Sequence, residues 1–227
     1  MIHLKPNKIL VLLGTMVFLT STLAKEKFPE TTKDGLKLQD HSSHGAIYVK
    51  EGASLANYTK VKILDCFVQF EKNWQRNYNR EEIGLDHQVT DKDVERIKQE
   101  VADEFPKAFK KELEKGGYEV VQETGEGILL LRPAIINLTV TSPNTNTAGW
   151  KTSVARSNGT MTLYLELYDS ASNTKIAEVI DGEALGNDGF AQRSGAVSNN
   201  AEFTRTMEKW ATTLIKRLDE ANGKSSG

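Results

Sequence analysis

Two segments with apolar residues at spacings of three and four constrain the fold more than any other feature of the chain. The first segment follows Thr90, a good N-cap residue with Asp93 three positions later, and ends at Gly116, a typical C-cap residue. We expect Pro106 to kink this helix, because proline removes a backbone donor and crowds the preceding turn. Its apolar stripe comprises Val94, Ile97, Val101, Phe105, Phe109 and Leu113.

A second amphipathic helix is predicted near the carboxyl end of the chain. Asn199 and Glu202 form a cap pair that predicts where it begins. Its apolar stripe comprises Phe203, Met207, Trp210, Leu214 and Leu218. Such a stripe needs an apolar surface to cover it, so we expect both helices to lie on one face of the same sheet.

Strands are expected at residues 46–49, 61–70, 118–121, 127–140, 161–168 and 175–180. Residues 161–168 alternate apolar and polar side chains, which is the period of a strand with one buried face. Residues 61–70 are apolar on both faces, as in a strand that is covered on both sides. Pro133 indicates a bulge or an edge position, because proline cannot donate to the strand ladder.

These elements predict an α+β fold, a two-layer sandwich in which two amphipathic helices cover one face of a mostly antiparallel sheet of five to six strands. The single domain is expected over residues 45–221. A polar extended arm is expected before it, at residues 25–44, and a flexible tail after it, at residues 222–227.

Residues 1–24 have the layout of a secretory signal peptide: two lysines, an apolar run at 9–19, and small residues up to Ala24. The apolar run is too short to cross about 30 Å of hydrocarbon, so we expect cleavage near Ala24 and a periplasmic or secreted mature chain. We expect no transmembrane span in the mature chain and, without a Cys at the cleavage position, no lipid anchor.

Composition excludes several classes of protein. With 29 Lys+Arg against 31 Asp+Glu, the chain has no electrostatic footprint for nucleic acid. A hydrophobic content of 38% argues against global disorder. Cys66 is the single cysteine, so packing must hold the fold without an internal disulfide.

Three stretches carry a resemblance to a known family: YVKEGASLANYTKVKI at 48–63, KKELEKGGYEVVQE at 110–123 and LYLELYDSASNTKIAEVIDGEA at 163–184. Together they resemble the bacterial envelope proteins of the domain of unknown function 3313 family. More distantly, the order of elements resembles the amino-terminal domain of the Tol-system periplasmic protein. The resemblance implies an envelope role and no catalytic residues. Members are commonly lipoproteins, whereas this chain lacks the lipidation Cys.

Cys66 is the sharpest candidate for chemistry, yet its apolar neighbours raise a thiol pKa and no His is close in sequence, so we interpret it as a buried structural residue. Asp65 is unusual beside it, and either ends the buried run or pairs with a distant Arg. His41 and His44, with Asp40, lack the further ligands that zinc requires. We therefore expect no catalytic residues, no metal and no cofactor.

The long polar connection at residues 71–89 is the main candidate for partner binding, because aromatic and Arg side chains are enriched at interaction hot spots. The predicted partner-binding residues are Trp74, Arg76, Tyr78 and Arg80. In the alternative, Trp74 and Tyr78 fold back to cap the sheet. If Trp74 is exposed, Trp74→Ala changes stability by less than about 1 kcal/mol. The Gly-rich stretch at 182–198 is a second candidate surface.

The sequence thus predicts a non-enzymatic, exported envelope protein that acts as a binding or accessory factor for an unknown envelope partner. The alternative is an enzyme, either a hydrolase built from dispersed carboxylates or a thiol enzyme that uses Cys66. Thiol labelling of the native protein separates the two.

Overall fold

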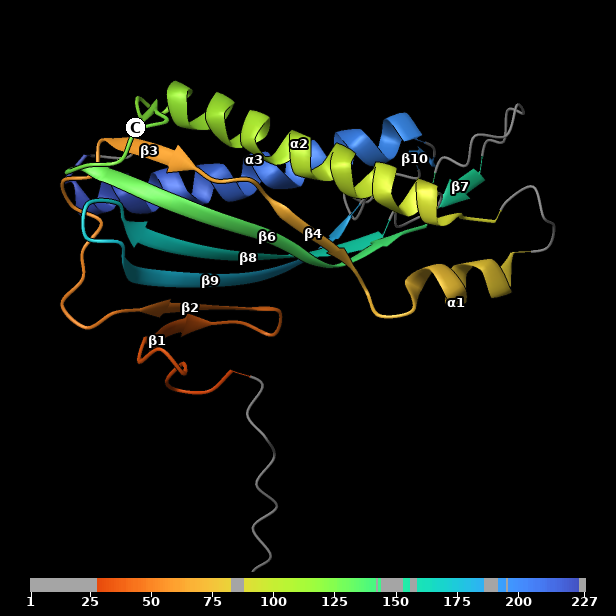
Figure 1. The fold of residues 1–227 in the computed structure, drawn as a ribbon, viewed down its shortest axis with the longest axis horizontal. Coiled ribbons are helices and arrows are strands. Elements are labelled where there is room, and N and C mark those ends of the chain that lie inside the picture. The colour runs from red at the N-terminus through yellow and green to blue at the C-terminus, as the bar shows by residue number, and fades with distance from the viewer. Residues whose placement is uncertain are drawn as a thin grey trace, which may run out of the picture.

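The computed structural model describes residues 28–82, 88–141, 143, 153–155, 159–185, 192–194 and 196–224. Within these residues the chain is an α+β structure, with two long helices side by side on one face of a mixed sheet (Figure 1). The predicted fold class is therefore confirmed, and a third, short helix lies at one end of the sheet.

The helices are α1 (Trp74–Glu81), α2 (Asp91–Lys115) and α3 (Ala196–Ala221). The strands are β1 (Lys37–His41), β2 (Gly45–Val49), β3 (Lys60–Ile63), β4 (Phe67–Phe70), β5 (Glu119–Val120), β6 (Ile128–Val140), β7 (Ser153–Ala155), β8 (Gly159–Asp169), β9 (Thr174–Leu185) and β10 (Gln192–Ser194).

The main sheet has eight strands rather than the five to six that the sequence predicts. Its order is β1-β2-β9-β8-β6-β3-β5, and β4 pairs with β6 outside this path. In this spatial order, each neighbouring pair from β1 through β2, β9 and β8 to β6 is antiparallel. β3 and β4 run parallel to β6, and β5 runs parallel to β3. The sheet is thus mostly antiparallel, as predicted, with a parallel end. β7 and β10 form a separate two-stranded sheet.

The predicted strand at 61–70 is two strands, since residues 64–66 leave the ladder between β3 and β4. Pro133 falls in the resulting gap on β6, because β3 pairs with β6 as far as Leu131 and β4 begins pairing at Ala134. β6 is an interior strand and has no bulge at Pro133, but no strand flanks it on one side at this residue, so Pro133 has a local edge position where a missing N–H is tolerated.

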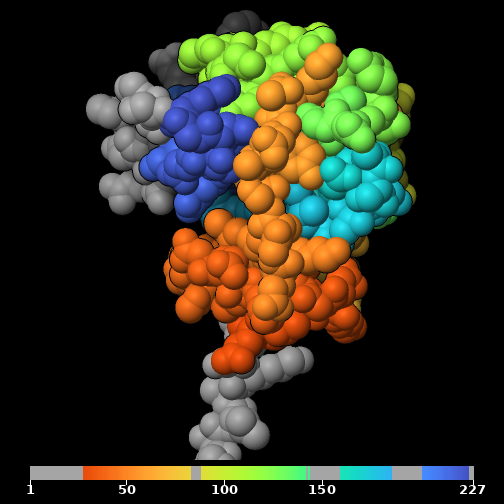
Figure 2. Space-filling view, turned by 90° about the vertical axis from the view of Figure 1, so that its left-hand side faces the viewer, coloured from red at the N-terminus to blue at the C-terminus, as the bar shows by residue number. Residues whose placement is uncertain are grey.

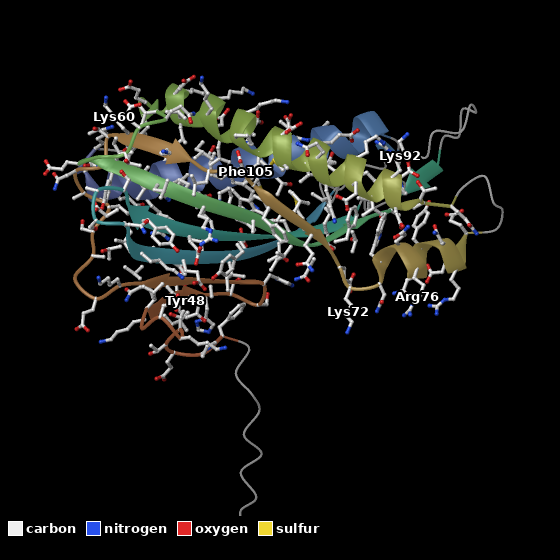
Figure 3. All side chains as sticks on the ribbon, in the orientation of Figure 1. Tyr48, Lys60, Lys72, Arg76, Lys92 and Phe105 are labelled. Atoms are coloured by element: carbon white, nitrogen blue, oxygen red, sulfur yellow. The ribbon has the colours of Figure 1, made fainter. Side chains whose placement is uncertain are left out.

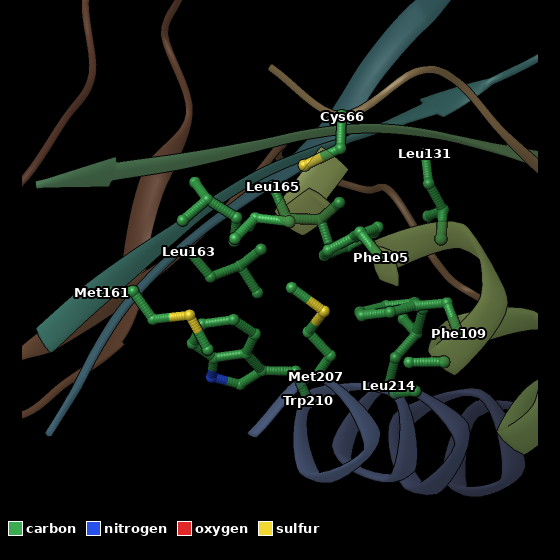
Figure 4. Packing of buried hydrophobic residues seen from close by; sticks show 14 of the residues in the cluster. Cys66, Phe105, Phe109, Leu131, Met161, Leu163, Leu165, Met207, Trp210 and Leu214 are labelled. Carbon is green, nitrogen blue, oxygen red and sulfur yellow. The ribbon is translucent and has the colours of Figure 1, made fainter. Parts of the chain in front are cut away.

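The core lies between α2 and α3 and the sheet face that they cover, and it contains both predicted helical stripes. Figure 4 shows Phe105 and Phe109 of α2 and Met207, Trp210 and Leu214 of α3 meeting Leu163 and Leu165 of β8. α2 begins with a capping box: Thr90 Oγ1 accepts from the Asp93 N–H at 3.2 Å, and the Thr90 N–H donates to Asp93 Oδ2 at 3.0 Å.

Several boundaries differ from the expected ones. α2 continues without a break past Pro106, and α3 begins at Ala196, before the predicted cap at Asn199. The stretch at 182–198, expected to be a loose loop, contains the end of β9, β10 and the start of α3; residues 186–191 and 195 lie outside the described residues.

The segment expected as a polar arm contributes β1, an edge strand on the far side of β2 from β9. Its apolar residues build a second, smaller cluster on the sheet face opposite the long helices. That cluster contains Leu36, Ala46 and Tyr48, with Phe28, Leu38 and Ile180 packed against it. The sequence pattern predicted no strand here, because most β1 side chains are exposed and polar and therefore show no apolar alternation.

The expected tail is also partly fixed. Asn222 accepts a hydrogen bond from the Asn57 N–H at 2.8 Å, and the Lys224 ammonium lies 4.3 Å from the centre of the Tyr118 ring. Among the described residues, no helix is long and apolar enough to span a bilayer.

Candidate functional site

The predicted partner-binding segment contains a helix, α1, rather than a continuous loop. Trp74 begins this helix and is only 8% exposed, because its ring stacks on Phe70 at a centroid distance of 4.2 Å. Tyr78 lies one turn later, 5.7 Å from Trp74, and burial raises the pKa of its hydroxyl to about 12. The structure therefore places Trp74 in the core, which agrees with the alternative in which the aromatic side chains cap the sheet.

Side-chain amides fix α1 to the segment that leads into α2. Gln75 Nε2 donates to the Val89 carbonyl at 3.1 Å, and Asn79 Nδ2 donates to the same carbonyl at 2.8 Å. Asn79 Oδ1 accepts from the Val89 N–H at 2.7 Å. Asn73, in the left-handed conformation with φ 65°, turns the chain from β4 into the helix. α1 is thus short and polar but held rigidly.

The outer face of α1 carries the remaining predicted residues. Arg76 and Arg80 are exposed and lie one turn apart, and Lys72 precedes them by the same spacing. Figure 3 shows Lys72 and Arg76 pointing into solvent on the same side of the molecule. Among the described residues these three cations, which we call the α1 ridge, form no ion pair with a carboxylate.

The ridge adjoins an open strand edge. Within the described residues β4 pairs with β6 alone, so its other edge is unpaired. Phe67 on this strand is 60% exposed, which is unusual for a large apolar side chain in this fold. A hollow of about 390 Å³ lies between β4, the start of α1 and α2, and Phe70, Trp74, Lys72 and Arg76 contribute to its lining. No local sequence pattern predicts the hollow, because α2 supplies one wall from a separate segment.

Cys66 is buried as predicted. It lies among apolar residues of the core (Figure 4), and burial raises the pKa of its thiol to about 12. Its sulfur donates a long hydrogen bond of 3.7 Å to the Phe67 carbonyl. Asp65 is exposed in the link between β3 and β4, so it ends the buried run. This environment suits a structural thiol and not a nucleophile.

Among the described residues, neither His41 nor His44 belongs to a group of three metal-ligating side chains. His44 Nδ1 lies 2.7 Å from Ser43 Oγ, His41 is exposed on β1, and His87 falls outside the described residues. A trio of carboxylates that the sequence analysis missed lies on the opposite sheet face, with ligand oxygens within 4.8 Å of one another: Asp34, Glu166 and Glu178. They come from three segments, so no local spacing in the sequence could reveal them.

Lys175 forms ion pairs with all three members of this trio. Its Nζ lies 2.6 Å from Asp34 Oδ2, 2.6 Å from Glu166 Oε1 and 3.3 Å from Glu178 Oε2. Burial by itself lowers the pKa of Lys175, but the hydrogen bonds to Asp34 and Glu166 outweigh burial and raise that pKa above its ordinary value. The ammonium therefore holds the position that a bound metal cation would need, and the cluster is an ion-pair network that ties the amino-terminal segment to the sheet.

A groove of about 680 Å³ lies between α3 and strands β2 and β9, on the same sheet face as the long helices. Its floor includes Ile47, Val49 and Val179, and Trp210 and Leu214 of α3 form one wall. Residues 53–55 close one end, within the segment (orange in Figure 2) that descends between α3 and the turn that joins β8 to β9. The sequence did not predict this groove, because its lining side chains have the same apolar pattern as residues of the hydrophobic core.

A comparison with protein-family models shows which family the chain belongs to. A family model described as "Protein of unknown function (DUF3313)" matches residues 25–214. The chain belongs to the DUF3313 family. The resemblance carried by the three sequence stretches is therefore confirmed, whereas the more distant resemblance to the Tol-system domain stays a prediction. No curated protein matches the DUF3313 chain.

Solved structures show partial likenesses at low sequence identity. A PelC dodecamer from Paraburkholderia phytofirmans is 12% identical over 72% of this chain and 93% of that chain, with a TM-score of 0.36. A DUF330 protein from Xanthomonas campestris is 12% identical over 69% of this chain and 81% of that chain, with a TM-score of 0.34. A DUF4136 protein from Bacteroides thetaiotaomicron is 10% identical over 79% of this chain and 98% of that chain, with a TM-score of 0.36.

Proposed function

We propose that this DUF3313 protein is an exported, non-enzymatic envelope protein that binds a partner protein through the α1 ridge and the open edge of β4. The observation that carries the proposal is the ridge itself: three exposed cations without ion pairs among the described residues, two on α1 and one just before it, where Trp74 and Tyr78 anchor the helix to the core. Export rests on the signal-peptide pattern of residues 1–24.

The chemistry of this surface favours an acidic, extended segment as the partner. Arg is enriched at interfaces because its guanidinium binds carboxylates through two parallel hydrogen bonds. An unpaired strand edge binds an extended chain by main-chain hydrogen bonds, and β4 has such an edge beside the exposed Phe67. Because Gln75 and Asn79 hold α1 in place, binding costs little ordering of the backbone.

The enzymatic alternatives lack support in the described residues. A thiol enzyme needs an accessible thiolate, whereas Cys66 is buried with a raised pKa. A hydrolase needs carboxylates that reach a substrate, whereas Lys175 occupies the centre of the trio of Asp34, Glu166 and Glu178.

Site-specific photo-cross-linking in intact cells tests the proposal. A photoreactive amino acid in place of Asn77, which is exposed between Arg76 and Arg80, is expected to give one dominant adduct that mass spectrometry identifies. The charge reversal Arg76→Glu/Arg80→Glu is expected to abolish this adduct. The matched control is Lys92→Glu/Lys216→Glu, which changes the net charge equally at two exposed lysines on α2 and α3 and should leave the adduct intact.

The free energy of unfolding of both double variants should lie within about 0.5 kcal/mol of the wild-type value, as expected for exposed positions. If the adduct still forms after the charges of Arg76 and Arg80 are reversed, the ridge is not part of the interface. Equal loss in both double variants would assign the effect to net charge. Cell fractionation and the mass of the mature chain test export, and a chain that retains residues 1–24 in the cytoplasm would contradict it.

A further inference from the structure

The groove beside α3 exists because the sheet is wider than the two helices that cover it. The path from β1 to β5 contains seven strands, and its six spacings of about 4.8 Å give a width of about 29 Å. Two packed helices cover only about 20 Å of such a sheet. Since α2 lies against β4 and β5 and α3 lies against part of β9, the same face of β2 and the rest of β9 stay open beside α3.

The interior of the groove is apolar along most of its length. Leu163, Leu165 and Leu167 of β8 form its deep side, and Ile47 and Val179 form the more open floor. The wall runs along α3 from Trp210 to Ala221, a distance of about 16 Å for a helix that rises 1.5 Å per residue. The shape is thus a narrow apolar channel of the size class that takes small ligands.

Negative polar groups gather at one end of this channel. Asp181 and Asp40 lie there, and Arg217 is the only Lys or Arg among the groove-lining residues, all of which belong to the described part of the chain. Asp181 Oδ2 accepts a hydrogen bond from Trp210 Nε1 at 2.9 Å, whereas Oδ1 receives no hydrogen bond from a described residue. A partly buried carboxylate with a free acceptor oxygen therefore stands at the mouth of an apolar channel.

The surroundings of Asp181 make a cationic ligand favourable. Burial raises the pKa of its carboxyl, and this effect outweighs the hydrogen bond from Trp210, which lowers that pKa; the charge of Glu183 raises it further, against Lys209 and His44. Lys209 is already paired with Glu183. The carboxylate is thus incompletely compensated inside the protein, and a cation placed against it regains electrostatic free energy.

We propose that this groove binds an alkyl-chain amphiphile with an ammonium head group, the chain lying along α3 and the head group donating to Asp181 beside Asp40. Apolar complementarity accounts for the chain, and charge complementarity selects the head group, since an anionic head would meet two carboxylates. The site is separate from the α1 ridge, so its test is independent of the partner-binding proposal.

Isothermal titration calorimetry of the purified chain with dodecylammonium, dodecanoate and dodecyl maltoside, each below its micellar concentration, tests the proposal. Dodecylammonium is expected to bind at least about tenfold more tightly than dodecanoate. Asp181→Asn keeps an acceptor for Trp210 Nε1 but removes the charge, so it should erase this preference while binding of dodecyl maltoside persists. Asp65→Asn, at an exposed position away from the groove, should leave the preference unchanged.

Two adjacent threonines of α3 give a matched steric test. Thr212 and Thr213 are both exposed and both donate to the carbonyl four residues earlier, but only Thr213 lines the groove. Thr213→Trp should weaken dodecylammonium binding about tenfold or more, and Thr212→Trp should change it less than about twofold.

Equal affinity for all three head groups would overturn the assignment of the head group, and no binding, or equal effects of both threonine variants, would overturn the site. Self-association that Thr213→Trp abolishes and Thr212→Trp does not would assign the groove to a second copy of the chain instead. An apolar peptide that displaces no bound dodecylammonium would support the amphiphile as the occupant.

Discussion

At the scale of single residues, burial and partners decide what each reactive group can do. Cys66 and Asp181 are both shielded from water, yet with different results. The thiol of Cys66 stays neutral in an apolar core, because burial disfavours its anion and no cation compensates it. The carboxyl of Asp181 keeps a free oxygen at the end of a groove, so the same physical effect leaves it poised for a ligand.

Cys66 should resist modification in the native protein. With its pKa raised to about 12 and its side chain buried, the thiolate is scarce and the sulfur is inaccessible at neutral pH. We expect iodoacetamide to label it only after unfolding in guanidinium chloride, as followed by intact-protein mass spectrometry. Rapid labelling of the folded chain, at the rate of a small-molecule thiol, would restore the thiol-enzyme alternative.

At the scale of elements, the sequence predicted what a repeating pattern can specify. α2 and α3 were predicted because each repeats apolar residues over several turns, and β8 because its apolar and polar side chains alternate. α1 has only Trp74 and Tyr78 on its buried side, which is too short a stripe to separate from a loop. Its hydrogen bonds to Val89 join residues that no local pattern relates. The candidate site was predictable at Arg76 and Arg80, whereas the groove arises from sheet width, which is a property of the assembled fold.

Trp74→Ala should therefore destabilise the protein, contrary to what exposure of Trp74 would imply. Removing a ring that stacks on Phe70 and is 8% exposed leaves a cavity, and we expect a loss of about 3 to 5 kcal/mol in the free energy of unfolding. Urea denaturation followed by circular dichroism measures it. Arg76→Ala, on the exposed face of the same helix, should change the free energy of unfolding by less than about 0.5 kcal/mol. A loss below about 1 kcal/mol for Trp74→Ala would show that the ring contributes little packing.

At the scale of the whole molecule, the fold has two apolar clusters on opposite faces of one sheet. The large cluster lies under α2 and α3, and the small one lies under the amino-terminal segment, around Leu36 and Tyr48. The small cluster buries few side chains, so it contributes modestly to the hydrophobic stabilisation. Lys175 joins this segment to β8 and β9 through Asp34 and two glutamates. The network therefore couples the amino-terminal segment to the stability of the sheet.

Lys175→Met should reveal this coupling. The change leaves Glu166 and Glu178 buried together without their shared cation, and we expect a loss of about 3 kcal/mol in the free energy of unfolding at neutral pH. Adding Glu166→Gln and Glu178→Gln should recover at least about half of that loss, because the uncompensated charges are then gone. Lys33→Met, at an exposed neighbour of Asp34, should change stability by less than about 0.5 kcal/mol.

The pH dependence of this loss follows from the raised pKa of Lys175. Because the folded-state pKa lies above the ordinary value of 10.5, the contribution of Lys175 is complete below that value and disappears as the pH rises through the folded-state pKa. The difference in unfolding free energy between the wild type and Lys175→Met should therefore be constant from about pH 7 to about pH 9, and shrink only in strong alkali. A difference that already declines near neutral pH would mean that the ammonium is not held by the three carboxylates, and the amino-terminal segment would then be fastened by the small apolar cluster alone.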